Sequence, residues 1–168
     1  MSLYFGIPIL LVAAVVQSVV FERISILGGR PDLVLLLVVT WSIIRGADEG
    51  ALWGFVGGVC CDLLSGSGLG LWTLSLTAVG LLVGQPWVHA LGPTIIRLAL
   101  MSAAGTLFGH LLLVLAMGLF GHFVAIGRAI QTVAGPAAVL NFLLSPFAFT
   151  FLVWFHRRSR RNLGGFAE

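Results

Sequence analysis

The stretch GALWGFVGGVCCDLLSG, residues 50–66, places glycine or aspartate at every fourth position. The regularly spaced residues are Gly50, Gly54, Gly58, Asp62 and Gly66. On an α-helix, residues four apart lie on nearly the same face, so these residues form one stripe without large apolar side chains. Glycine disfavours helix formation, and in a membrane a glycine stripe is typical of close approach by another helix. The sequence therefore predicts a groove in which a helix docks.

The composition is that of a membrane protein with several spans. Of the 168 residues, 59% are hydrophobic and only 9% are charged. A soluble domain carries about a quarter charged residues, so the composition excludes an ordinary soluble domain. The apolar runs are continuous and do not alternate as β-barrel strands do. We therefore expect an all-α membrane protein.

Six apolar segments predict a compact bundle of six transmembrane helices within residues 1–156. The segments are 3–21, 31–44, 50–65, 70–88, 94–118 and 129–155. A full crossing takes roughly 20 residues, and the second and third segments are shorter than that. Two arrangements stay open for these two segments. They cross the bilayer fully, or they form a helical hairpin that crosses only part of it.

Arginine placement predicts the orientation, because arginine is enriched on the cytoplasmic side of membrane proteins. With six spans both termini lie on one side, which receives Arg45, Arg97 and the tail of residues 157–168. The tail carries Arg157, Arg158, Arg160 and Arg161, and the opposite side receives only Arg23, Arg30 and Arg128. We therefore expect both the N- and the C-terminus to be cytoplasmic.

The basic tail accounts for the net charge of +3, so that charge gives no indication of nucleic-acid binding. The four tail arginines are candidates for contact with anionic lipid or with a cytoplasmic partner. The simpler interpretation is that they only anchor the last span. Tryptophans also lie near the predicted span ends, where interfacial anchors are expected. They are Trp41, Trp53, Trp72, Trp87 and Trp154.

Two charged residues flank the predicted hairpin of the second and third segments. Arg30 precedes one segment, and Asp62 lies near the far end of the other. In an antiparallel hairpin these ends are neighbours, so we expect a structural charge pair between Arg30 and Asp62. The alternative is a proton or ion relay, which needs more ionisable groups along a path. Only His110 lies deep in a predicted span.

Two further glycine pairs predict close helix packing, Gly105 with Gly109 and Gly80 with Gly84. His110 follows one pair directly, and we expect it to make a hydrogen bond between helices. Asn141 and Gln131 in the sixth segment are expected to do the same.

The sequence contains no motif of a known catalytic site. It has no GxSxG or HExxH motif and no phosphate-binding loop. We expect no enzymatic activity, no cofactor and no bound metal. Polar residues at the outer ends of the spans are sparse, so we also expect no pocket for a vitamin.

The second and third segments resemble the MreD family of rod shape-determining proteins. The residues that carry the resemblance are Arg30, Pro31, Trp41, Asp62, Gly66, Leu69 and Gly70. The family pattern is an Arg-Pro start to the second span, a tryptophan further on, and glycines leading to Asp-x-x-x-Gly-x-x-Leu-Gly. These motifs cover the second and third segments, and the rest of the chain matches in hydropathy.

This resemblance implies a non-enzymatic scaffold in the bacterial inner membrane. Such a scaffold binds MreC and helps to organise peptidoglycan synthesis and cell shape. MreB, RodA and its penicillin-binding transpeptidase are implied in the wider complex, together with membrane lipids. The single span of MreC is one candidate occupant of the glycine groove.

The resemblance also implies an alternative function. The family is similar in fold to the substrate-binding subunits of energy-coupling-factor transporters. The alternative is therefore a membrane subunit that binds a vitamin for such a transporter.

Overall fold

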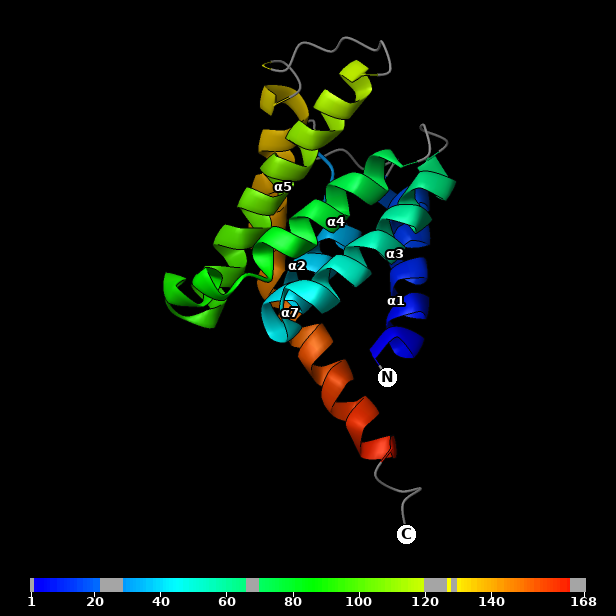
Figure 1. The fold of residues 1–168 in the computed structure, drawn as a ribbon, viewed down its shortest axis with the longest axis vertical. Helices are drawn as coiled ribbons and strands as arrows, with labels where there is room; N and C mark the ends of the chain where they lie inside the picture. The colour runs from blue at the N-terminus through cyan, green and yellow to red at the C-terminus, as the bar shows by residue number, and fades with distance from the viewer. Residues whose placement is uncertain (1, 22–28, 66–69, 120–126, 128–129, 164–168) are drawn as a thin grey trace.

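The computed structural model describes the chain except for residues 1, 22–28, 66–69, 120–126, 128–129 and 164–168. For residues 2–5, 20–21, 119 and 155–163 it describes the backbone alone. The described residues form helices and no β-strand element (Figure 1). The helices are α1 (Ser2–Val16), η1 (Gln17–Phe21), α2 (Leu33–Arg45), α3 (Ala47–Ser65), α4 (Leu71–Val83), η2 (Pro86–Leu91), α5 (Thr94–Leu119), η3 (Ile130–Ala134) and α7 (Gly135–Leu163). The predicted all-helical fold is confirmed.

The helices differ in their capacity to cross a membrane. By length and composition, Thr94–Gly118 and Ile130–Trp154 qualify as membrane spans. Three shorter apolar helices accompany them, at Gly6–Val19, Leu33–Arg45 and Leu71–Val83. The structure thus supports a membrane protein with several helices, and the number of full crossings stays a prediction.

Two helix boundaries differ from those expected from hydropathy. The segment 70–88 divides after Val83, because Pro86 has no N–H and pushes the preceding residue out of the helical region. Gln85 is accordingly extended, with ψ of 148°. At the other boundary, α2 and α3 are joined by Gly46 alone, whose φ of 95° suits glycine.

The backbone of the last helix continues into the predicted tail, and the division of the chain at residue 157 stays a prediction. The backbone of α7 stays helical to Leu163 and so includes the four tail arginines. Figure 1 shows this end of α7 extending beyond the other helices. The structure therefore shows no break in the helix at residue 157.

Helix α2 forms the centre of the fold. All ten residues from Val34 to Ile43 are buried. The helix contacts α1, α3, α4, α5 and α7, which surround it. A helix that is apolar on every side is stable only when other elements cover it completely. The short second segment is therefore the core helix of the molecule.

Two of the five tryptophans are wrongly predicted as interfacial anchors. Trp41 and Trp53 are buried, and their rings stack with centroids 4.4 Å apart. The reason is that α2 is covered on all sides and that α3 turns Trp53 toward it and toward Gly6 of α1. Trp87 and Trp154, by contrast, are exposed.

Candidate functional site

The glycine stripe of α3 faces the backbone of α4. A Cβ atom added to Gly54 would lie 2.6 Å from the carbonyl carbon of Leu76. One added to Gly58 would lie 2.7 Å from the main-chain nitrogen of Thr73. One added to Gly50 would meet the Ser42 side chain of α2 and would lie 2.8 Å from the Gly80 carbonyl oxygen of α4. No side chain fits at these positions without displacing backbone. The helix that fills the groove is thus α4 of the same chain, and the groove is not free for a partner's helix.

The other glycine pairs take part in the same packing. Gly80 of α4 faces the backbone of Gly50 across the groove. Gly105 and Gly109 of α5 lie against the opposite side of α4, where the Ser75 hydroxyl donates a hydrogen bond to the Gly109 carbonyl at 2.7 Å. Helix α4 is thus held between glycine-bearing faces of α3 and α5. The remaining residue of the predicted stripe, Gly66, lies outside the described residues.

Asp62 is buried and caps the N-terminus of α4 from the neighbouring helix. Its carboxylate accepts hydrogen bonds from the main-chain N–H groups of Gly70 (2.9 Å), Trp72 (2.9 Å) and Thr73 (3.1 Å). The Thr73 hydroxyl donates a fourth bond at 2.6 Å. The first N–H groups of a helix lack partners within it, and the helix dipole favours a negative charge there.

The predicted pair of Arg30 with Asp62 is not formed in the described part of the chain. The ion pair found there joins Arg45 to Glu49, at 2.8 Å. Asp62 instead has the N-terminus of α4 as its partner, as described above. Arg30 lines a cavity at the same end of the bundle.

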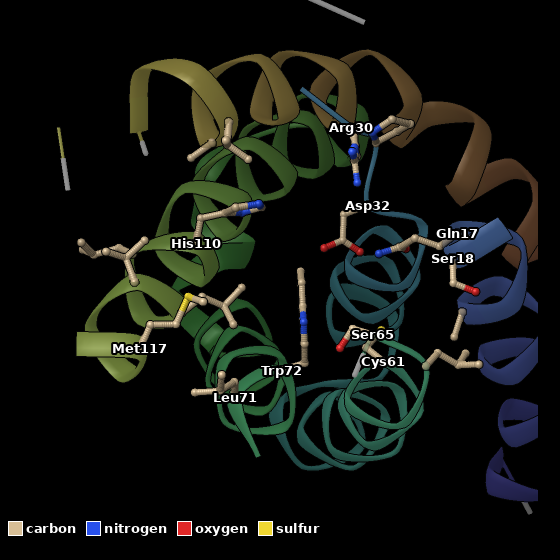
Figure 2. Close-up of a pocket in the computed structure, with 18 of the residues that line it drawn as sticks. Gln17, Ser18, Arg30, Asp32, Cys61, Ser65, Leu71, Trp72, His110 and Met117 are labelled. Carbon is tan, nitrogen blue, oxygen red and sulfur yellow. The ribbon is translucent and has the colours of Figure 1, made fainter. Parts of the chain in front are cut away.

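This cavity has a volume of about 590 Å³ and lies among η1, the start of α2, the end of α3, the start of α4, α5 and η3 (Figure 2). Its polar lining consists of Gln17, Ser18, Arg30, Asp32, Ser65 and His110. Apolar side chains that include Leu71, Trp72 and Met117 complete the wall. Polar groups thus gather at this end more than the sequence suggested, and the absence of a vitamin pocket stays a prediction. Residues distant in the sequence converge here.

Asp32 is the most deeply buried charged residue of the cavity, with 4% of its surface exposed. Its Oδ1 atom accepts a hydrogen bond from the Leu35 N–H at 2.9 Å and so caps α2. Its own main-chain N–H donates to Asn141 Oδ1 at 3.0 Å, and Asn141 donates onward to Thr106 at 2.9 Å. The carboxyl oxygen Oδ2, however, has no hydrogen-bond partner among the described residues.

The predicted role of Asn141 as a hydrogen-bond link between helices is thereby confirmed, since it joins α7 to α2 and α5. Gln131, for which the same role was predicted, is exposed.

His110 faces the cavity from α5 (Figure 2). Its Nδ1 atom lies 2.8 Å from the Thr106 carbonyl oxygen, which can only accept a hydrogen bond. Nδ1 therefore carries a proton, and in the tautomer that this bond selects Nε2 is the acceptor nitrogen. The ring meets Trp72 edge to face, with centroids 6.4 Å apart. His110 thus has one nitrogen fixed within its helix and one available to the cavity.

The structure gives little further information on the other predicted site residues. The side chains of Arg157, Arg158, Arg160 and Arg161 lie outside the described residues. No group of three His, Cys, Asp or Glu side chains in the described ranges could hold a metal ion. Asp32 was not among the site residues predicted from the sequence. The available signal was that Gln17, Ser18, Arg30 and Asp32 all lie at the same predicted end of the first two segments.

A second hollow lies between α1 and α7 and has α2 as its floor. Its volume is about 600 Å³. Every residue that lines it is apolar: Pro8, Ile9, Val12, Ala13, Val16, Leu33, Leu36, Leu37, Leu144, Phe147, Ala148 and Phe151. We call this surface the α1–α7 groove. Unlike the glycine stripe, it has no helix of the described chain within it.

Comparison with known proteins gives one match. The family model described as rod shape-determining protein MreD matches residues 1–158. No curated protein and no solved structure matches the chain.

Proposed function

We propose, because the chain belongs to the MreD family of rod shape-determining proteins, that it is a membrane scaffold that binds MreC and helps to organise peptidoglycan synthesis. Membership of the family implies a non-enzymatic role in rod-shape determination. The observation that carries the proposal is the length of the match, which covers residues 1–158 of 168.

The surface of the bundle supports a scaffold in the membrane. Large apolar side chains are exposed on several helices, among them Leu63 of α3, Ile95 of α5 and Phe147 of α7. In water such a surface would drive aggregation, whereas in a bilayer it faces lipid or a partner helix.

We place the single span of MreC in the α1–α7 groove. The glycine stripe is already filled by α4, whereas this groove is open and entirely apolar. In lipid, helices associate mainly through close packing, so a groove that receives a helix gains more contact than a convex face. MreB, RodA and its penicillin-binding transpeptidase belong to the wider complex in this proposal. The tail arginines of α7 would contact lipid or cytoplasmic components.

Co-purification with MreC tests both parts of this proposal. Ala148→Trp fills the α1–α7 groove, and we expect it to reduce MreC recovery about tenfold, which corresponds to about 1.4 kcal/mol. Val139→Trp is the matched control, because Val139 is an exposed apolar residue of α7 outside the groove.

The possible results distinguish the scaffold function from the assignment of MreC to the α1–α7 groove. If the unmodified chain does not retain MreC, the scaffold function is wrong. If both tryptophan variants retain MreC equally, only the assignment to the groove is wrong. The melting temperature of each variant shows whether the chain itself stays intact.

One observation favours the alternative function of a vitamin-binding transporter subunit. The cavity of about 590 Å³ is within the usual size of small-molecule sites. A rise in melting temperature with micromolar riboflavin, thiamine or biotin would support this alternative over the scaffold.

A further inference from the structure

Two opposite charges line the cavity without forming an ion pair with each other. Asp32 lies at the inner end with its Oδ2 atom unpaired, and Arg30 is exposed at the rim. Figure 2 shows the Gln17 amide beside Asp32, yet Oδ2 still lacks a hydrogen bond. Burying a carboxylate oxygen without a partner is unfavourable. An additional N–H donor at this position would therefore satisfy an oxygen that the described side chains leave without a hydrogen bond.

A second acceptor lies across the cavity from Asp32. In Figure 2 the His110 ring and the Asp32 carboxyl group come from opposite walls and point toward the same space. Because Nδ1 donates to the Thr106 carbonyl, Nε2 is the nitrogen that accepts when the ring carries a single proton. A primary ammonium group carries three N–H donors and can satisfy both acceptors at once.

We infer that the cavity binds a zwitterionic amine, with its ammonium group between Asp32 and His110 and its anionic group at Arg30. A guanidinium group matches the geometry of phosphate and carboxylate, so the anionic end suits Arg30. This binding site is independent of MreC binding, because the α1–α7 groove shares none of its lining residues.

The rest of the wall indicates that the ligand also has an apolar part. Leu71, Trp72, Leu111, Val114 and Met117 all line the cavity. Two sources supply the required chemistry. One is the headgroup of an amino-phospholipid such as phosphatidylethanolamine, whose acyl chains would cover these side chains. The other is a small free zwitterion.

Lipid binding to the purified full chain tests the inference. Retention of added lipid is measured by native mass spectrometry, and the melting temperature is measured in parallel. Phosphatidylethanolamine should be retained and should raise the melting temperature. Phosphatidylcholine has the same charges but no N–H donor, and phosphatidylglycerol has no cation. Both should be retained at least about tenfold less, a difference of about 1.4 kcal/mol.

Glycerophosphoethanolamine, which lacks acyl chains, distinguishes a lipid headgroup from a free zwitterion. It should bind comparably to phosphatidylethanolamine only if the ligand is a free zwitterion.

Variants link the binding to the cavity. Asp32→Asn keeps a side chain that caps helices well but removes the charge. His110→Gln removes the ring and has no role in capping, so it tests the site even if Asp32→Asn folds poorly. Each should reduce retention of phosphatidylethanolamine about tenfold. Asp48→Asn, which removes a carboxylate outside the cavity, should leave retention unchanged. Equal retention of the three phospholipids, or unchanged retention in both cavity variants, would overturn the inference.

Discussion

At the scale of single residues, Asp62 shows how one buried charge organises two helices. It belongs to α3, yet its hydrogen bonds all go to the start of α4. The link therefore sets where α4 begins and holds that end against α3. Arg30 takes no part in this arrangement.

The first prediction concerns the coupling of these two residues. Asp62→Ala removes the acceptor of four hydrogen bonds, and we expect it to lower the free energy of unfolding by about 1–3 kcal/mol. Arg30→Ala should change stability little, because the side chain is exposed. Thermal unfolding in detergent measures both. The double variant should resemble Asp62→Ala alone, and a coupling energy above about 0.5 kcal/mol would restore the ion pair predicted from the sequence.

At the scale of helices, the closest packing is that of α3 against α4. Gly50, Gly54 and Gly58 let the two backbones meet directly. The contact leaves no space even for a methyl group. At a glycine with no other atoms nearby, by contrast, an added methyl group should fit without loss of stability.

The second prediction compares two glycine-to-alanine changes. Gly54→Ala introduces a Cβ atom against the backbone of Leu76, and we expect a loss of about 1–3 kcal/mol in stability from overpacking. Gly118→Ala in α5 is the matched control. A Cβ there meets nothing within 4 Å, so higher helix propensity should leave stability equal or raise it by up to about 1 kcal/mol. Chemical or thermal unfolding of the isolated chain measures both, and equal effects would show that the α3–α4 contact is looser than described.

The positions of the helices along the sequence were easier to predict than the contacts between them. Hydropathy placed all six segments on helices, because apolar runs and the Gly-Pro breaks between them are local signals. The glycine stripe indicated that some helix approaches, but glycine carries no side chain to identify which one. Trp41 was misread for a related reason, since hydropathy does not distinguish lipid from protein as an apolar neighbour. The missing hydrogen-bond partner of Asp32 Oδ2 was not predictable from the sequence, because it depends on how several other helices pack around the cavity.

At the scale of the whole molecule, the chain passes back and forth between two ends. In Figure 1 the start of α1, the end of α7, the α2–α3 corner and η2 all lie below the ends of α3 and α5. This alternation agrees with an even number of passes. The side of the membrane on which the termini lie stays a prediction from the arginines.

The third prediction tests that orientation by labelling. Single cysteines replace Ser2, Ser67, Ala90 and Leu163 in a chain without Cys60 and Cys61. A membrane-impermeant reagent added outside intact cells should label only position 67, because more arginines lie on the side of the termini. Permeabilised cells should allow labelling at all four positions. External labelling of position 163 would contradict the orientation.

The unbroken course of α7 has a mechanical consequence. Asn141 near one end holds the main-chain N–H of Asp32, and Arg157 follows about 16 residues later, roughly 24 Å along the axis. An α-helix is stiff along its length, so a displacement of the arginine-bearing end reaches Asn141 as a movement of the whole rod. Pro146 lies between them and lacks an N–H, which makes it the point where the rod bends most easily. Helix α7 therefore couples a movement of its arginine-bearing end to the hydrogen bond between Asn141 and Asp32 at the inner end of the cavity.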